Sequence, residues 1–249
     1  MAEEMRPFGS PGRTRPFEAS GARAFRRLLL DVLFPGRCLL CGSWLEPGAG
    51  TPLCATCRES ITVDRGPRCR RCGIALVSER AVCMRCRAVE RAFTTCFALF
   101  PNRGAPREIL QALKFEGRTR LAPIVAEWVA AELHRLHPDV VVVPAPPRRA
   151  RRGPDAVERI CRVLERRHGI VVHRLLERTG GVEQKSLDYE ERSRNLRGRI
   201  SAAAGRAVPD RLVLFDDVFT TGATLDACAR ALRDAGAREV SAITLLIEE

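Results

Sequence analysis

Cysteine is the residue type in this 249-residue chain that most clearly suggests chemistry, because eight of its eleven copies form four Cys-x-x-Cys pairs. The eight are Cys38, Cys41, Cys54, Cys57, Cys69, Cys72, Cys83 and Cys86. A Cys-x-x-Cys knuckle brings two thiolates to one ion, and zinc favours four thiolates in a tetrahedron, so the spacing predicts two closed, structural zinc sites. In the absence of a secretory pattern, zinc is favoured over disulfides, and a reducing cytoplasm is the expected location. Redox activity is the disfavoured alternative.

Two pairings of the four knuckles are open. The sequential pairing gives each ion two adjacent knuckles, and we favour it because each site then closes only a short loop. The interleaved pairing joins the first knuckle to the third and the second to the fourth. Gly42 and Gly73 directly follow two knuckles, where a tight turn often needs a positive φ. The remaining cysteines, which are expected to be ordinary buried thiols, are Cys96, Cys161 and Cys228.

A second segment with chemical potential runs from Asp216 to Thr224, between an apolar strand pattern and a helix pattern. Open α/β sheets bind ligands at the carboxyl ends of their strands, and N–H groups at a helix N-terminus bind anions. The predicted phosphate ligands are Thr220, Thr221, Gly222, Ala223 and Thr224. Asp216 and Asp217 are placed to accept hydrogen bonds from two ribose hydroxyls. The alternative is a solvated turn with a threonine N-cap, and the Gly-x-x-x-x-Gly-Lys pattern of a Walker loop is absent.

The elements that must position these residues alternate between strand and helix patterns. Strands are predicted at 93–100, 139–143, 170–176, 211–215 and 239–247, and helices at 106–115, 121–136, 154–167 and 224–235. This alternation predicts an α/β fold, in which an open, mostly parallel sheet carries helices on both faces and follows a small N-terminal double zinc ribbon. Residues 177–208 are polar and contain glycine, which favours an insertion or a lid.

The chain is expected to have four parts. These are a disordered tail (1–20), a helix (21–36), the double zinc ribbon (37–90) and the α/β domain (91–249). The N-terminal helix is amphipathic, and packing against the zinc module is favoured over binding at a membrane surface. No apolar stretch approaches the about eighteen residues that a membrane span needs.

The net charge of +12 is the third informative feature. A strongly basic chain favours nucleic acid or phosphorylated ligands as partners. The alternative is a compositional bias of the genome, because nearly all the positive residues are arginine and the only lysines are Lys114 and Lys185.

The run from Asp216 to Thr224 resembles the phosphoribosyl pyrophosphate motif of type I phosphoribosyltransferases. From about Arg37 to the C-terminus, the chain resembles the ComF family of competence proteins, which joins a double zinc ribbon to a domain of that type. The supporting segments are 113–117, 143–146 and 184–187, with Arg192 and Asn195 beyond them.

The resemblance implies a ligand, namely phosphoribosyl pyrophosphate or a related ribose 5-phosphate, bound with Mg²⁺. The basic loop 148–153, which includes Arg151, Arg152 and Gly153, would occupy the pyrophosphate position. Lys114 would balance the leaving charge, and the segment from Gln184 to Asn195 would close over the site. The family has Arg-Gly-Phe-Asn-Gln after the basic loop, whereas this chain has Pro154-Asp155-Ala156 after Gly153. A carboxylate at this position would repel pyrophosphate.

Three functions are consistent with the resemblance. One is an enzyme that transfers a phosphoribosyl group to an acceptor that the sequence does not identify. The second is a non-catalytic factor that handles single-stranded DNA during DNA uptake in natural competence, beside competence and helicase proteins. The third is a sensor of phosphoribosyl pyrophosphate. The low aromatic content of 5% counts against strong, general binding of single-stranded DNA.

Overall fold

The computed structural model describes residues 36–77, 80–136, 141–147, 155–179 and 198–248. The predicted tail and nearly all of the predicted N-terminal helix lie outside these ranges. So do Arg151, Arg152, Gly153 and Gln184. By compactness, the chain divides into Met1–Cys54 and Ala55–Glu249. The predicted boundary between residues 90 and 91 stays a prediction.

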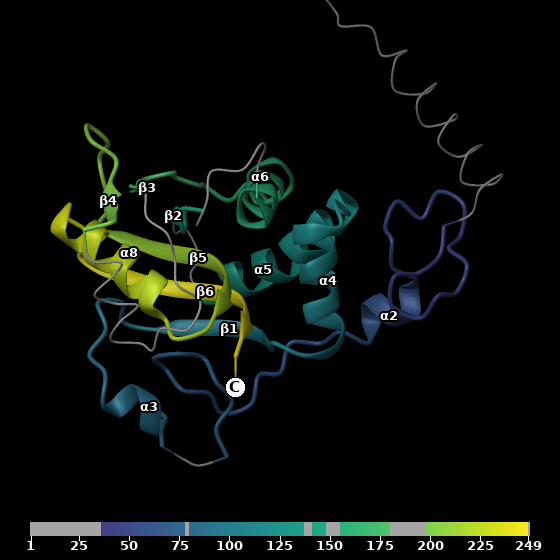
Figure 1. Ribbon diagram of the computed structural model, residues 1–249, viewed down its shortest axis with the longest axis horizontal. Coiled ribbons are helices and arrows are strands. Elements are labelled where there is room, and N and C mark those ends of the chain that lie inside the picture. The colour runs from purple at the N-terminus through teal and green to yellow at the C-terminus, as the bar shows by residue number, and fades with distance from the viewer. Residues whose placement is uncertain (1–35, 78–79, 137–140, 148–154, 180–197, 249) are drawn as a thin grey trace, which may run out of the picture. The chain divides into compact units, whose positions relative to one another are not determined.

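A four-stranded parallel sheet forms the centre of the second unit (Figure 1). Its strands are, in spatial order, β1 (Cys96–Pro101), β6 (Glu239–Ile247), β5 (Arg211–Phe219) and β2 (Val141–Pro144). The strands predicted at these four places are confirmed. β5 is longer than predicted, because its pairing with β6 continues through Val218 and Phe219 instead of stopping at the first carboxylate.

The strand predicted at 170–176 is largely wrong. Only Val172 forms an isolated parallel bridge there, with Val142 of β2. Because β2 has only four residues, a further strand beside it would have few residues with which to pair. The chain instead continues into β3 (Leu176–Arg178), which pairs antiparallel with β4 (Ile200–Ala202) in a separate two-stranded sheet.

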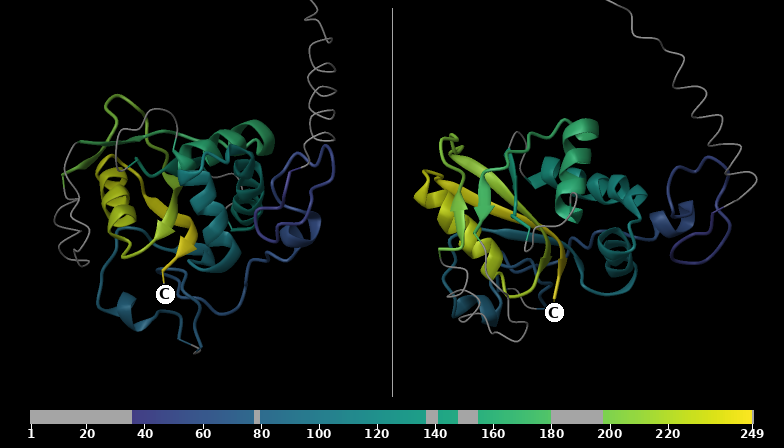
Figure 2. Two further views of the ribbon diagram at one scale, coloured as in Figure 1. Left: turned by 45° about the vertical axis from the view of Figure 1, so that its right-hand side comes forward. Right: turned by 45° about the horizontal axis from the view of Figure 1, so that its top comes forward.

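Helices cover both faces of the parallel sheet, as predicted (Figure 2). The long helices are α4 (Gly104–Phe115), α5 (Ala122–Leu136), α6 (Ala156–His168) and α8 (Ala223–Asp234). Short helical turns occur at α2 (Ala55–Glu59), α3 (Met84–Arg87) and η1 (Thr119–Leu121). Helices α5 and α6 pack on each other and on the sheet, whereas α8 packs on β5, β6 and the small sheet. None of the described helices combines the length and apolar character that crossing a bilayer requires.

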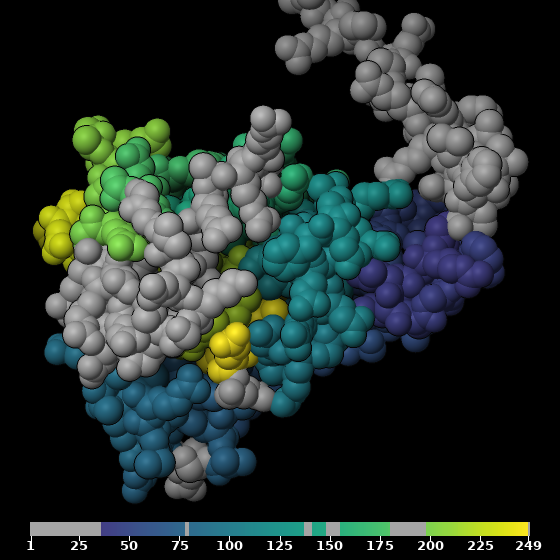
Figure 3. Space-filling view, in the orientation of Figure 1, coloured from purple at the N-terminus to yellow at the C-terminus, as the bar shows by residue number. Residues whose placement is uncertain are grey.

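The α8 face of the sheet has a core that includes part of the cysteine-rich segment. Cys69, Cys72 and Cys86 are buried in one cluster with Leu214 of β5 and Leu225 of α8. In the orientation shared by Figures 1 and 3, the chain around α3 lies below β1. The second half of the cysteine module therefore belongs to the hydrophobic core of the α/β unit.

Backbone contacts join this half of the module to β1. The N–H of Cys96 donates to the carbonyl of Arg70 at 3.0 Å, and Arg68 Nη1 donates to the carbonyl of Ala98 at 2.8 Å. Gly73, with φ +79°, lies against the same strand. A Cβ at Gly73 would stand 2.5 Å from the backbone nitrogen of Ala98, so only glycine fits this contact.

We expect Gly73→Ala to lower the free energy of unfolding by about 3 kcal/mol, because it adds a backbone clash to the strain of a left-handed conformation. Gly169→Ala is the matched control, since Gly169 has φ +65° and no atom within 4 Å of an added Cβ. Strain alone should make that control cost about 1 kcal/mol. Urea unfolding measures both values, and equal losses in the two variants would contradict the close approach.

Candidate functional site

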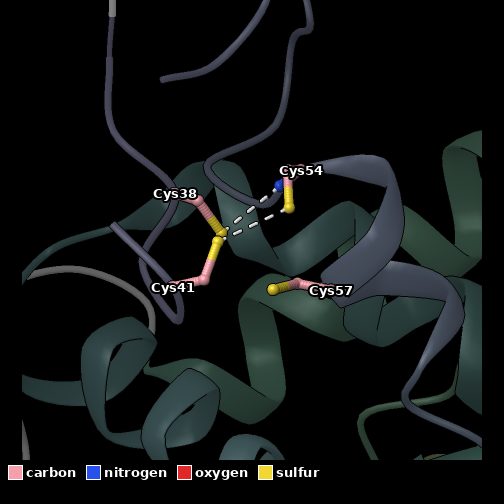
Figure 4. Close-up of side chains that lie close together, drawn as sticks. All are labelled: Cys38, Cys41, Cys54 and Cys57. Atoms are coloured by element: carbon pink, nitrogen blue, oxygen red, sulfur yellow. Dashed lines mark hydrogen bonds between the residues drawn. The ribbon is translucent and has the colours of Figure 1, made fainter. Parts of the chain in front are cut away.

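The eight knuckle cysteines form two tetrads. One contains Cys38, Cys41, Cys54 and Cys57, and the other Cys69, Cys72, Cys83 and Cys86; within each tetrad the sulfur atoms lie within 4.8 Å of one another. Figure 4 shows the four side chains of the first tetrad pointing toward a common centre. The structure thus contains the sequential pairing that we favoured, and the interleaved pairing is wrong.

The sulfur positions fit zinc. The Sγ atoms of Cys41 and Cys54 are 3.7 Å apart, and those of Cys72 and Cys83 are 3.8 Å apart. A tetrahedron with Zn–S bonds of about 2.3 Å has sulfur–sulfur edges of about 3.8 Å. The N–H of Cys54 also donates to Cys38 Sγ at 3.4 Å, which orients a ligand sulfur. Because four thiolates fill the coordination sphere, these sites suit a structural ion.

The second tetrad favours the thiolate form that binds a metal at Cys86. The pKa of Cys86 is lowered to about 5, chiefly by a hydrogen bond with Cys72 and also by the charge of Arg91. The same hydrogen bond and burial raise the pKa of Cys72. The predicted positive φ is present at both knuckle glycines, with +72° at Gly42 and +79° at Gly73. The three cysteines outside the tetrads are buried as predicted, and burial raises the pKa of each: Cys96, Cys161 and Cys228.

The predicted phosphate loop lies between β5 and α8. Gly222 is the N-cap of α8 and has φ +79°, a left-handed conformation that turns the chain into the helix. The first N–H groups of a helix lack partners within it, so they can bind an anion. Thr220, Thr221 and Thr224 are partly exposed, and Thr221 Oγ1 accepts from the N–H of Ala223 at 3.4 Å.

The two carboxylates before this loop have different partners. Lys114 Nζ of α4 forms an ion pair with Asp217 Oδ2 at 2.5 Å. The side chain of Lys114 is 25% exposed and that of Asp217 is 21% exposed. Asp216 Oδ1 accepts from the N–H of Asp217 at 2.8 Å. Burial raises the pKa of Cys228 in α8, and the charge of Asp216 raises it further. The structure therefore brings Lys114, Asp216, Asp217 and the loop together at one end of β5.

The predicted basic loop 148–153 lies outside the described residues, but the segments on both sides of it are described. The N–H of Ala145 donates to the carbonyl of Phe215 at 2.8 Å, so the chain leading to the basic loop leaves β2 beside Asp216. Beyond that loop, Asp155 Oδ1 accepts from the N–H of Glu158 at 2.8 Å and caps α6. The departure from the family pattern at Asp155 thus has a structural role as a helix cap, which the expectation of simple repulsion had missed.

Arg91 is a residue near the site that sequence reasoning missed. Its Nη2 donates to the carbonyl of Thr221 at 3.0 Å, although the two residues are separated by 130 positions. No motif marks Arg91. The available signal was its place beside Phe93, between the last knuckle and the first strand of the α/β domain.

Three proteins are similar to nearly the whole chain. Competence protein ComFC of Streptococcus pneumoniae is 25% identical over 84% of this chain and 99% of its own length. ComFC of Bacillus subtilis is 28% identical over 84% of this chain and 94% of its own. Competence protein F of Haemophilus influenzae is 28% identical over 83% of this chain and 95% of its own. A family model described as a double zinc ribbon domain matches residues 29–87.

Similar solved structures include phosphoribosyltransferases. A hypoxanthine phosphoribosyltransferase from Staphylococcus aureus has a TM-score of 0.31 and 11% identity, and the alignment covers 51% of this chain and 62% of that enzyme, less than two thirds of its length. A phosphoribosyltransferase from Corynebacterium diphtheriae has a TM-score of 0.33 and 21% identity, with 57% and 67% covered.

The structure has two cysteine tetrads with zinc-ribbon spacing and, after them, a parallel α/β sheet with helices on both faces. The protein therefore belongs to the class in which a zinc ribbon precedes an α/β domain. Its near full-length similarity to three competence proteins confirms the resemblance that the motifs predicted. The chain is therefore similar to competence proteins of the ComF family over 83–84% of its length.

Proposed function

We propose that the chain binds phosphoribosyl pyrophosphate, or a related ribose 5-phosphate, at the end of β5. The observation that carries this proposal is the arrangement of Gly222 at the N-terminus of α8, with two partly exposed carboxylates, Asp216 and Asp217, shortly before it on β5. A helix N-terminus attracts a phosphate, and carboxylates accept hydrogen bonds from vicinal hydroxyls. A sugar phosphate carries both kinds of group.

Lys114 makes the site suitable for an anion. Two adjacent carboxylates alone would repel a phosphorylated ligand, but the Lys114 ammonium already neutralises Asp217 at 2.5 Å. When a ribose hydroxyl donates to Asp217, the ammonium is close enough to bind a ligand oxygen instead. The site therefore exchanges an internal ion pair for contacts with the ligand.

Transfer of the phosphoribosyl group is the reaction we propose for this site. The bond between the anomeric carbon and the diphosphate oxygen breaks, the diphosphate leaves with the electron pair, and an acceptor forms the new bond to that carbon. The sugar gains positive charge in the transition state, which Asp216 and Asp217 stabilise electrostatically. We further propose Arg151 and Arg152 as diphosphate ligands. Mg²⁺, a hard cation suited to oxygen ligands, would enter with the diphosphate.

Calorimetric titration of the zinc-loaded protein tests the ligand class. Phosphoribosyl pyrophosphate with Mg²⁺ and ribose 5-phosphate alone should both bind saturably, because both carry the 5-phosphate and the ribose hydroxyls. Inorganic pyrophosphate should bind more weakly, since it lacks the sugar. Equal affinity for pyrophosphate and ribose 5-phosphate would mean that the site is a general anion site, against the proposal.

A second candidate function, the handling of single-stranded DNA, is favoured by an exposed aromatic residue, Trp44. The Arg37 guanidinium lies 3.9 Å from the centroid of the Trp44 ring, and Trp44 is 60% exposed. An arginine beside an exposed ring is a stacking platform for bases. Oligothymidine should quench tryptophan fluorescence with an affinity that falls steeply with salt. No quenching at low salt would remove this candidate.

A further inference from the structure

Arg91 lies beneath the proposed phosphate loop. Its guanidinium carbon is 5.6 Å from the ring centroid of Phe93 and 5.4 Å from that of Phe219, the last residue of β5. Its Nη2 donates to the carbonyl of Thr221 at 3.0 Å. A planar guanidinium that contacts rings and a carbonyl together has little freedom, so the loop backbone rests on a fixed group.

The left-handed conformation at Gly222 is shaped against the same side chain. A Cβ on Gly222 would stand 2.4 Å from Arg91 Nη1 and 2.6 Å from Phe219 Cζ. The loop therefore approaches Arg91 more closely than any residue with a side chain would allow.

Arg91 also lies beside the second tetrad, because it lines one cavity with Cys72, Cys83 and Cys86. Arg71 Nη1 donates to the carbonyls of Cys86 and Val89, at 3.1 and 3.0 Å, and so fixes the chain that leads from the tetrad to Arg91.

The tetrad and the loop also border one cavity of about 230 Å³. Its lining includes Cys72, Cys83, Cys86, Arg91, Phe219 and Thr221. The tetrad and the loop therefore line the same space, with Arg91 as a common neighbour.

The residue after Arg91 fastens the same segment to α8. The N–H of Ala92 donates to Asp226 Oδ1 at 2.7 Å, and Asp226 is buried in the first turn of the helix. Arg230 Nε donates to the other carboxylate oxygen at 3.0 Å, and Arg233 Nε donates to the carbonyl of Ala92. Residues 91 and 92 thus hold both the loop and the helix that follows it.

We propose that Arg91 is a positioning residue that couples the second cysteine tetrad to the loop Thr220–Thr224, so that zinc in this tetrad strengthens the binding of a phosphorylated ribose. The ligand part rests on the proposed function. Zinc fixes Cys86 and the chain that carries Arg91, and Arg91 then holds the loop in its binding conformation before the ligand arrives. Preorganisation of this kind raises affinity because less freedom is lost on binding.

Variants at Arg91 test whether this residue strengthens ligand binding, with ribose 5-phosphate as the probe. Arg91→Ala should weaken its binding about tenfold or more, a common size for coupling between sites, while the zinc content stays at that of the wild type. Arg91→Lys should recover only part of the affinity, because lysine lacks the planar fork of donors. Arg85→Ala is the matched control, since Arg85 lines the same cavity and should leave affinity unchanged. Wild-type affinity in Arg91→Ala, or an equal loss in Arg85→Ala, would overturn the assignment.

Amide hydrogen exchange of a peptide covering 219–224 tests the coupling without a ligand. Exchange there should be faster in zinc-loaded Arg91→Ala than in the wild type, and removal of zinc from the wild type should produce a similar increase. The β6 peptide 239–247 reports any general loosening and should remain protected in Arg91→Ala. Unchanged exchange at 219–224 overturns the coupling. Fast exchange together with no ribose 5-phosphate binding by the wild type would support the coupling and refute the proposed function.

Discussion

Cys72→Ser should lower the free energy of unfolding of the α/β unit by about 3 kcal/mol or more, a size expected when a structural metal site is lost from a core. Cys72 is 5% exposed and belongs to the same core cluster as Leu214 and Leu225. Serine binds zinc poorly and would leave a polar group in this cluster. The loss therefore combines weakened metal binding with damage to the packing of α8 on the sheet.

Two matched variants separate these causes. Cys41→Ser removes a ligand of the first tetrad from an exposed position, so the zinc content should fall while the sheet unfolds at nearly its normal temperature. Cys161→Ser replaces a buried cysteine outside both tetrads, so the zinc content should stay at that of the wild type. Zinc content by mass spectrometry and thermal unfolding by circular dichroism measure the outcomes. Full zinc content and wild-type stability in Cys72→Ser would contradict the structural role of the second tetrad.

The second large effect is expected on ligand binding. The double variant Asp216→Asn/Asp217→Asn should weaken ribose 5-phosphate binding about 100-fold, because two hydrogen bonds to charged acceptors are replaced by weaker ones. Asp216→Asn alone should cost more affinity than Asp217→Asn. The reason is that Asp217→Asn also releases Lys114 from its ion pair, and the released ammonium then attracts the phosphate.

Asp210→Asn is the control for the change in net charge. Asp210 lies before β5, and its carboxylate pairs with Arg238 at 3.5 Å on the exposed surface, with 64% of its side chain accessible. It should bind ribose 5-phosphate as the wild type does. Calorimetry measures the affinity of each of the four variants and of the wild type for ribose 5-phosphate, and thermal unfolding checks that each variant is folded. A double variant that binds like the wild type would exclude the carboxylate pair from the site.

The sequence was informative where the chemistry is local. Knuckle spacing identified all eight members of the two tetrads, and loop-closure length favoured the pairing that is present. The apolar runs placed β5 and β6, because strands buried between two layers of helices have few polar positions. The loop between β5 and α8 was also predictable, since Gly222 needs its positive φ where a strand turns into a helix.

The sequence was less informative where a contact joins distant segments. The packing of Gly73 on Ala98 depends on a tertiary approach that no local pattern specifies. The contact between Arg91 and Thr221 joins residues 130 positions apart. The residues at 170–175 have the composition of a strand, but a four-residue β2 leaves them only one bridge. In each case the partner segment decides the outcome.

We propose above that the loop Thr220–Thr224 binds the phosphate of a phosphorylated ribose. The most direct test of this claim is nuclear magnetic resonance of the zinc-loaded protein, with nitrogen-15 in glycine and threonine, during titration with ribose 5-phosphate. We expect saturable shifts of the amide signals of Gly222 and Thr224, while the signal of Gly169, at the far end of α6, stays unchanged. Titration without movement of the Gly222 and Thr224 signals would contradict the claim.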